Sequence, residues 1–410
     1  MRTIKKTIAV LAAAALLAGC SVMPAVSSGS VEEIAAPAAQ TLNACADPAL
    51  APALQAYCAA QDVELKNGDR TAALLLTDYK PDGVDALPMR SDTLLQAAAD
   101  RAGAADADSL PMGSCLYGYW ANEAALTALL GENAVTALQN ASWAEWSDFI
   151  ETLSAWLAAP KAAKVTLSGT DYTLPAQRPA DVAATAVFAP PTDVAAGYTA
   201  ALLAADGKYT ADALTGPVNG VYSAVTLEAD HMAADGENAV FCRGKLTDLL
   251  AAYGSDACEG LALIPFKCEL EESDLTTEEY NLTGLLNYPV LARTGWITLN
   301  ADADEAAQKA AKSAALWLYT GGSGEAALTE TLGLITPWNT ASDKTAMGAL
   351  QVKQVGTGIL PATAVNEGTA AALAENETAL RGTKHTAAQR KAFTARVVEI
   401  FAAYGEAQPQ

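Results

Sequence analysis

Residues 109–160 have the sequence SLPMGSCLYGYWANEAALTALLGENAVTALQNASWAEWSDFIETLSAWLAAP, and the second half of this stretch predicts a well-defined helix. Ser142 and Glu145 form a capping box, in which each side chain satisfies a backbone N–H at the start of the helix. Pro160 marks its end, because proline cannot continue the hydrogen-bonded ladder. Between these two signals, apolar side chains recur on one face, which we expect to pack in a core. They are Trp146, Ile150, Leu153 and Leu157.

Short strand patterns and helix patterns alternate along the rest of the chain, which is typical of an α/β fold. Helices are expected at 47–61 and 91–103, and a strand is expected at 82–89, just before the second of them. The 410 residues are enough for two domains. The order of elements therefore predicts an α/β protein rather than a helical bundle or a β-sandwich.

Two further helices are predicted near the C-terminus, over 302–319 and 386–405. In the first, small residues on one face allow close packing on a sheet, and two glycines at 321–322 end the helix. In the second, an apolar stripe predicts a helix docked on the body of the protein. The first face consists of Ala307, Ala311, Ala314 and Leu318, and the second of Phe393, Val397, Ile400 and Tyr404.

The N-terminus has the pattern of a secretory signal peptide over residues 1–19, with Arg2, Lys5 and Lys6 before an apolar run at 8–17. The run is too short to span a bilayer as a helix. Residues 17–20, Leu-Ala-Gly-Cys, resemble a bacterial lipobox, which implies cleavage before Cys20 and transfer of a diacylglyceryl group to its thiol. The alternative is an ordinary signal peptide. Residues 20–40 are small, polar and proline-containing, and predict a flexible tether.

The composition is that of an acidic exported protein. The chain carries a net charge of −22, and residues 1–19 contain three basic and no acidic side chains, so the mature chain is more acidic still. Such a body repels nucleic acid and anionic lipid headgroups, which excludes both as partners. No segment after the signal region is long and apolar enough to span a membrane.

Six cysteines remain besides Cys20, and an even number in an exported chain permits disulfides. Short loops favour the pair Cys45–Cys58 and a pair formed by Cys258 with either Cys268 or Cys242. Free buried thiols are the alternative. No C-x-x-C motif is present, so a zinc ribbon or a thioredoxin-like redox site is not expected.

Known catalytic and cofactor motifs are absent from the sequence. His231 and His385 are its two histidines, too few for a three-histidine metal site. Neither a G-x-S-x-G elbow nor a glycine-rich phosphate loop occurs. We therefore expect no metal, no cofactor and no nucleophilic enzyme. A glycosidase needs two carboxylates on either side of the scissile bond. Because the chain has many acidic residues, a glycosidase remains an alternative.

Several pieces occur in an order that resembles the extracellular solute-binding proteins of bacterial ABC importers, of the carbohydrate type known as family 1. The segments ANEAAL and EWSDF resemble an aromatic-Asn element and a helix start that follow a crossing strand. AVFCRGKLTDLL and EGLALIPF resemble a Gly-Lys segment and a strand ending in Leu-Pro. Residues 294–339 resemble a returning strand, an alanine-rich helix and a final turn. These pieces lie at 121–126, 145–149, 239–250, 259–266 and 294–339.

The sequence also departs from the family's pattern. The opening strand is shortened around 41–44, the Gly-Lys segment continues as Leu246-Thr247-Asp248, and the final turn has Thr336 between Ile335 and Pro337. These differences concern the ligand class more than the fold.

The resemblance implies two α/β lobes of the type II periplasmic-binding-protein kind, joined by about three crossings, with a ligand cleft between them. The crossings are expected near Cys115–Tyr119, Ala292–Trp296 and Ile335–Trp338. The N-terminal lobe would comprise 41–116 and 297–335, and the C-terminal lobe 120–292 and 338–410.

The same resemblance indicates which residues would contact the ligand. Aromatic residues beside the crossings are the main candidates, with Trp296 and Trp338 first because each follows a Gly or Pro turn. Polar side chains near the crossings are weaker candidates, and one tyrosine is expected on the wall of the second lobe. The remaining candidates are Tyr117, Tyr119, Trp120, Tyr222, Asp78, Arg90, Arg293 and Asn339.

The function implied is that of a non-enzymatic, monomeric receptor that captures a sugar or oligosaccharide and delivers it to ABC transporter permease subunits. Lipid on Cys20 would hold it on the outer face of the bacterial cytoplasmic membrane. A lipid-anchored cell-surface polysaccharide hydrolase, a structural or adhesion lipoprotein, and a receptor for a peptide or polyamine are the alternatives.

Overall fold

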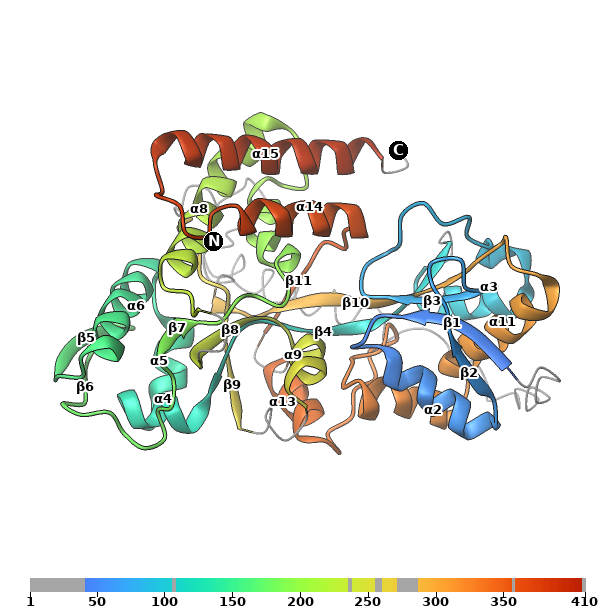
Figure 1. Cartoon of the computed structure of the whole chain (residues 1–410), viewed down its shortest axis with the longest axis horizontal. Helices are drawn as coiled ribbons and strands as arrows, with labels where there is room; N and C mark the ends of the chain where they lie inside the picture. The colour runs from blue at the N-terminus through green and yellow to red at the C-terminus, as the bar shows by residue number, and fades with distance from the viewer. Residues whose placement is uncertain are drawn as a thin grey trace, which may run out of the picture.

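The structure is a computed structural model that describes residues 41–104, 108–234, 238–254, 260–270, 287–355 and 358–407. Within them, one mixed sheet runs along the whole molecule in the order β2-β1-β3-β10-β4-β8-β7, with β11 beside β10 and β9 beside β4 (Figure 1). The strands are β1 Thr41–Ala46, β2 Glu64–Asn67, β3 Leu74–Thr77, β4 Ser109–Asn122, β7 Ala186–Phe188, β8 Ala239–Lys245, β9 Leu261–Ile264, β10 Val290–Leu299 and β11 Leu360–Pro361. A separate hairpin consists of β5 Ala163–Leu167 and β6 Thr170–Leu174.

Helices pack around the two ends of this sheet and form two lobes (Figure 1). The first lobe contains β1–β3 and the helices α2 Ala51–Gln61, α3 Thr93–Arg101, α11 Glu305–Tyr319 and α12 Gly322–Ala326. The second contains β5–β9 and the helices α4 Glu123–Leu130, α5 Ala134–Asn140, α6 Trp143–Ala158, α7 Thr199–Ala204, α8 Ala211–Asp230, α14 Glu367–Thr378 and α15 Ala387–Glu406. The shorter elements are the 3-10 helices η1 Met89–Ser91 and η2 Ala195–Tyr198, the π-helix η5 Ala327–Thr331, and α9 Leu246–Tyr253 and α13 Ala346–Val355 near the junction.

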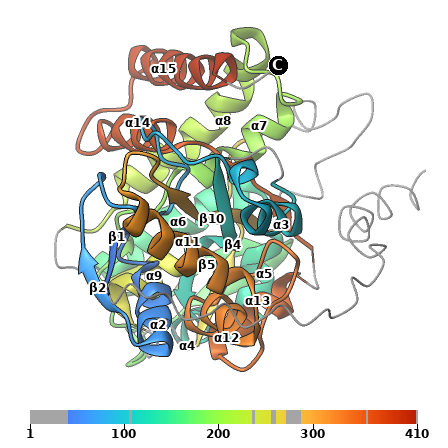
Figure 2. The same ribbon diagram turned by 90° about the vertical axis from the view of Figure 1, so that its right-hand side faces the viewer.

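Each lobe has its own hydrophobic core. Leu42, Leu74 and Ile297 are buried in the first core, under the alanine-rich face of α11. Trp146 and Phe241 are buried in the second. Figure 2 shows α2, α11 and α12 gathered at the first lobe's end of the sheet. Two cores joined by a sheet make the predicted two-lobe α/β architecture.

Among the described residues, three segments pass between the lobes. β4 and β10 are long antiparallel strands whose register pairs Trp296 with Pro111 and Val290 with Tyr117. The third is the chain at Ile335, whose backbone exchanges two hydrogen bonds with Ser114, at 2.8 and 2.9 Å. The expected number of crossings is therefore confirmed.

Helix α6, which is capped by Ser142, forms where its local signals predict it. The Ser142 side chain accepts a hydrogen bond from the Glu145 backbone N–H, and the Glu145 carboxylate accepts one from the Ser142 N–H at 2.9 Å. The predicted apolar face is buried, and Trp146 stacks on Tyr119 with ring centroids 5.1 Å apart. Trp146 is thus a core residue, as predicted.

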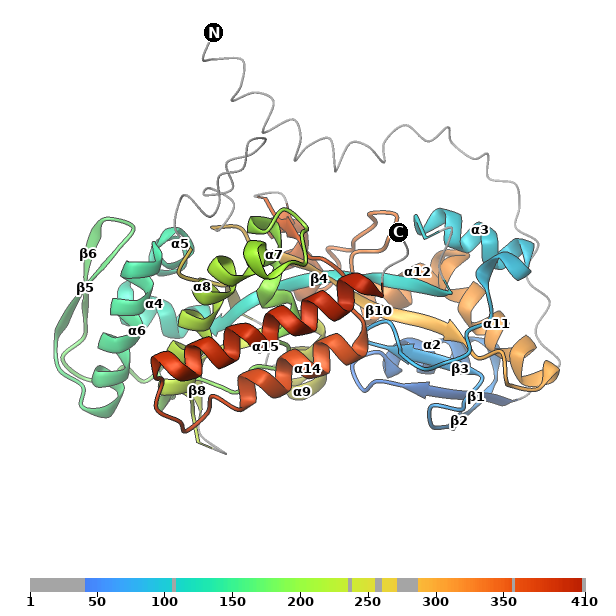
Figure 3. The ribbon, with the colours of Figure 1, turned by 90° about the horizontal axis from the view of Figure 1, so that it is seen from above.

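The two C-terminal helix predictions are also confirmed. α11 begins at an Asp304 cap and buries Ala311, Ala314 and Leu318. α15 begins at a capping box formed by Thr386 and Gln389 and packs against α8 and α14. Figure 3 shows α14 and α15 side by side over the middle of the sheet. In the part of the chain that is described, no helix is long and apolar enough to cross a bilayer.

The strand predicted at 82–89 is wrong. The strand that precedes α3 is β3, whose four residues are all buried between β1 and β10. Residues 82–88 form a loop with an isolated bridge from Ala86 to Asn300, because Gly83 has a positive φ of 69° and Pro88 precedes the short helix η1. In the sequence, the central strand β3 is marked by a continuous run of apolar residues and not by alternation of apolar and polar residues.

Candidate functional site

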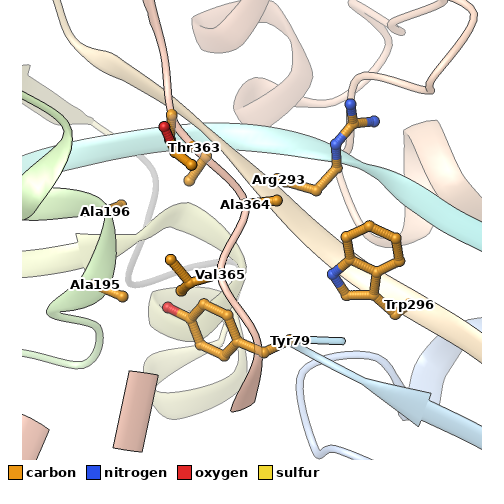
Figure 4. A pocket seen from close by; sticks show the side chains of 10 residues that line it. Tyr79, Ala195, Ala196, Arg293, Trp296, Thr363, Ala364 and Val365 are labelled. Carbon is orange, nitrogen blue, oxygen red and sulfur yellow. The ribbon is translucent and has the colours of Figure 1, made fainter. Parts of the chain in front are cut away.

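A pocket lies at the junction of the two lobes (Figure 4). Tyr79 follows β3, and Ala292, Arg293 and Trp296 belong to β10. The second lobe contributes Ala195 and Ala196 of η2 and the segment Ala362–Val365 after β11. Its volume is about 300 Å³, part of which is open to solvent, and the enclosed part has room for roughly one water molecule. A ring-sized guest enters this pocket only if the lobes separate.

Trp296 reaches the pocket because of the glycine before it. Gly295 has a φ of 79°, and a Cβ at this position would lie 2.9 Å from the Met112 sulfur. Only glycine tolerates both the left-handed backbone and the close approach of β4. Trp296 itself is half-buried, so the rest of its indole is accessible from the pocket.

A buried charge cluster lies behind Tyr79 and joins the lobes. Lys245, at the end of β8, contacts the carboxylate of Asp78 from the first lobe and lies 3.4 Å from Asp193 Oδ2. Its ammonium also lies 4.4 Å from the centre of the Tyr79 ring, and the Tyr79 hydroxyl donates to Asp193. Because Asp78 and Tyr79 follow β3 while Lys245 and Asp193 belong to the second lobe, these contacts hold the pocket's two walls together.

The pKa values in this cluster show how much charge is buried. Burial opposes the charge on Lys245, but Asp78 and its neighbours outweigh this effect and raise the pKa of the ammonium well above its usual value. Burial raises the pKa of Asp78, and it raises that of Asp248 well above the ordinary range, although Lys245 opposes both shifts. Oxygen atoms of Asp78, Asp193 and Asp248 lie within 4.8 Å of one another, with the Lys245 ammonium in contact with the first two.

A second buried network supports the wall formed by the second lobe. The Arg243 guanidinium lies 2.8 Å from Glu228, 2.5 Å from Glu377 and 2.8 Å from the Tyr117 hydroxyl. The Tyr119 hydroxyl donates to Glu228 at 2.6 Å. Burial raises the pKa of Glu377 to about 7, with Arg243 opposing the shift. This network fixes β4 and β8 to α8 and α14.

Of the residues singled out from the sequence, Trp296 and Arg293 line the pocket, and Asp78 lies just behind it. The three aromatic residues of the first crossing are buried instead. Tyr117 and Tyr119 belong to the second lobe's core, and the Trp120 indole donates to the Gly244 carbonyl at 2.9 Å.

The other candidates are not among the residues that line the pocket. The Trp338 indole donates to Glu325 at 2.8 Å and is covered by the Arg101 guanidinium, 3.8 Å from the ring centre. Tyr222 packs edge-on against Phe393 of α15. The last two candidates are Asn339, in a turn with a φ of 62°, and Arg90, exposed in η1.

Sequence reasoning missed Tyr79, Asp193 and the Ala362–Val365 segment. Asp78 and Tyr79 directly follow the apolar run of β3. Their position at the end of a central strand is the signal that could have identified them as site residues. Lys245 lies within the Gly-Lys segment that the sequence analysis singled out. No local pattern marks Asp193 or the Ala-Thr-Ala-Val segment.

The structure gives Cys45, Cys58, Cys115 and Cys268 as free thiols, which differs from the expected Cys45–Cys58 disulfide and agrees with the alternative of free thiols. Leu42 and Ala44 of β1 are buried with Cys58 of α2 in the first core. Because neighbouring side chains of a strand alternate in direction, Cys45 points to the opposite face. Cys20 and Cys258, and with them the lipidation site and the other proposed disulfides, lie outside the described residues.

Comparison with solved structures identifies the fold. A Streptococcus pneumoniae solute-binding protein in complex with the blood group A-trisaccharide matches with a TM-score of 0.56 and 11% identity, over 88% of this chain and all of that one. The bacterial solute receptor AcbH, which prefers β-D-galactopyranose, matches at 0.53 and 12%, over 88% and 98%. The Thermus thermophilus maltotriose-binding protein, bound with maltotriose, matches at 0.52 and 12%, over 88% and 99%.

No protein-family model and no curated protein sequence matches the chain. The structural likeness shows a two-lobe fold of the periplasmic-binding-protein type that extends over most of the chain.

Proposed function

We propose that this protein is an extracytoplasmic receptor that captures a sugar between its two lobes and delivers it to an ABC importer. The observation that carries the proposal is the pocket at the junction, which is walled by Tyr79 and Trp296 on one side and by η2 and the Ala362–Val365 segment on the other. A guest in this position contacts both lobes at once. The sugar ligands of similarly folded proteins support the same class of guest.

The architecture suits a receptor that signals occupancy by closing. A guest that contacts both walls favours the closed state, and a shift from 1:99 to 99:1 requires about 5.5 kcal/mol of differential affinity. The half-buried Trp296 ring offers an apolar face to the C–H groups of a sugar. Expulsion of water on closure increases the cost of any hydroxyl that finds no partner.

The pocket supports binding rather than hydrolysis. A glycosidase places two carboxyl groups about the scissile bond. None of the ten residues that line this pocket is Asp or Glu. Asp78 and Asp193, behind Tyr79, are engaged with the Lys245 ammonium. We therefore propose that the guest leaves chemically unchanged.

Calorimetric titration of the purified protein with hexoses and oligosaccharides tests the receptor. We expect binding of at least one sugar, a decrease in the radius of gyration by small-angle scattering, and recovery of the unchanged sugar by chromatography. Trp296→Ala should weaken binding at least about tenfold without unfolding the protein. Trp143→Ala, at the start of α6 and outside the pocket, is the matched control and should bind normally. Absence of binding to every sugar, or cleavage of the sugar, would contradict the proposal.

We also propose that Cys20 carries the lipid that holds the receptor on the outer face of the cytoplasmic membrane, where it would meet the importer's permease subunits. The lipobox-like residues 17–20 support this anchor. Expression of the full chain in a bacterial host with a labelled fatty acid should label the wild type, and Cys20→Ala should remove the label. Labelling that persists in Cys20→Ala would contradict the assignment.

A further inference from the structure

The charge inside the pocket is opposite in sign to that of the whole protein. The chain has a net charge of −22, yet Arg293 is the one charged side chain among the ten that line the pocket. The other polar side chains there are Tyr79, Trp296 and Thr363, and the Tyr79 hydroxyl already donates to Asp193. The pocket thus combines a cation with an indole N–H and two hydroxyls, and its lining contains no carboxylate or amide side chain.

Arg293 also lacks the partners that other buried arginines have. Arg243 is paired with Glu228 and Glu377, and Arg178 donates to the carbonyls of Ala184 and Leu157. In the described part of the chain, the Arg293 guanidinium has neither an ion pair nor a hydrogen bond. Burial lowers its pKa and the neighbouring Tyr319 only partly opposes the shift, so the charged form is disfavoured by its removal from water.

Arg293 and Trp296 come from the same strand and lie close in sequence on β10. Figure 4 shows both side chains on one side of the Ala362–Val365 segment, with Ala195 and Ala196 on the other side in this view. A ring stacked on Trp296 therefore has the Arg293 side chain on the same part of the pocket wall. The remaining lining is mostly alanine and valine, which adds shape but no charge.

The chemistry of the guest follows from the guanidinium. The hydroxyls of a sugar ring both donate and accept hydrogen bonds whether the sugar is neutral or charged, so they do not account for a cation in the pocket. A carboxylate only accepts, and it matches the two parallel N–H groups of a guanidinium. The enclosed part of the pocket has room for roughly one water molecule, so a single ring is the sugar that requires the least separation of the lobes.

We infer that the solute is a single sugar ring that carries a carboxylate, a hexuronic acid, and that Arg293 binds this carboxylate while Trp296 packs against the ring. The inference rests on the proposed receptor function and names its ligand class. It accounts for a half-buried guanidinium that has no ion pair and no hydrogen bond among the residues that the structure describes.

The test is a calorimetric titration of paired ligands, in which glucuronate, galacturonate and mannuronate are each compared with the hexose of the same ring configuration. We expect the wild type to bind at least one hexuronate more than tenfold tighter than its neutral counterpart. Arg293→Gln should lower the affinity for that hexuronate by roughly 10- to 100-fold and change the affinity for the neutral sugar by less than about threefold. Arg293→Lys should retain part of the preference, because the charge remains while the bidentate geometry is lost.

Arg396→Gln is the matched control, because Arg396 is exposed on α15 and pairs only with Glu399 in the described part of the chain. It should bind like the wild type. If Arg293→Gln does not fold, the wild-type preference and Arg293→Lys decide the question.

Tighter binding of a neutral sugar than of every hexuronate would overturn the inference and leave the receptor function standing. A preference for a sugar phosphate over the hexuronates, or an Arg293→Gln variant with full hexuronate affinity, would also overturn it. If no sugar of either kind binds, the proposed function fails and the inference fails with it.

Discussion

Lys245 and Asp78 are separated by 167 positions, yet they form a buried ion pair between the two lobes. Lys245 ends β8 in the second lobe, and Asp78 follows β3 in the first. Asp193 completes the cluster, and the Tyr79 ring covers the ammonium. One buried positive charge therefore contributes to the relative position of the lobes.

Lys245→Met should destabilise the protein by about 3–5 kcal/mol, because it leaves Asp78, Asp193 and Asp248 buried without a counter-charge. The pKa values of Asp78 and Asp248 are already raised by burial, and loss of Lys245 raises them further. A folded state with raised carboxyl pKa values binds protons that the unfolded state releases, so the variant should become more stable as the pH falls toward 5. Urea denaturation at pH 5 and pH 7.5 measures this change. Lys164→Met, an exposed site on β5, is the control, and equal stability of the two variants would contradict the prediction.

Glu377 should give the protein a pH-dependent stability. Burial raises its pKa from 4.5 to about 7 in the folded state, so between these values the folded protein keeps a proton that the unfolded chain has lost. The contribution is complete below pH 4.5 and is lost as the pH rises through 7. Relative to Glu377→Gln, the wild type should lose stability on the order of 3 kcal/mol across this range. Denaturation of both proteins at several pH values measures the difference. Glu375→Gln, exposed on the same helix, should follow the wild type, and parallel curves for Glu377→Gln would refute the prediction.

Gly113→Ala should weaken the third crossing between the lobes. A Cβ at Gly113 would lie 2.6 Å from the Ile335 carbonyl oxygen and 3.0 Å from the Leu334 Cβ. The backbone at Ile335 must then move away from β4, and we expect a loss of about 1–3 kcal/mol in thermal or chemical denaturation. Gly322→Ala adds a methyl group where nothing lies within 4 Å and should be nearly neutral. A Gly113→Ala protein as stable as Gly322→Ala would show that the close contact between Gly113 and Ile335 does not affect the free energy of unfolding.

Cys45 and Cys58 should be found as thiols. The strand directs Cys45 away from the core that contains Cys58, so a disulfide would require the backbone to shift. Alkylation of the unfolded protein without reductant, followed by peptide mass spectrometry, should modify both residues. Recovery of a peptide pair joined through Cys45 and Cys58 would show that the sequence-based disulfide was right.

Local signals were sufficient for α6, α11 and α15. The capping boxes at Ser142 and Thr386 and the apolar stripes that follow them depend on residues three or four apart, so α6 and α15 were predictable with their packed faces. The order of segments also indicated two lobes and three crossings. The stretch 82–89 was wrongly predicted as a strand. Its apolar residues are interrupted by turn residues, and whether these break the strand depends on the neighbouring strands.

The sequence by itself determined the helices with clear capping signals and the two-lobe α/β architecture. Only the tertiary structure decided which side chains face the pocket. Both faces of β4 and β10 are covered, so alternation along the strands does not distinguish Tyr119, stacked on Trp146 in a core, from Trp296, open to the pocket. The residues that complete the wall, Tyr79, Ala195 and Thr363, come from segments more than 100 positions apart, and no local pattern relates them. Their proximity results from long-range packing, in which the buried contact of Asp78 with Lys245 brings the two halves of the chain together.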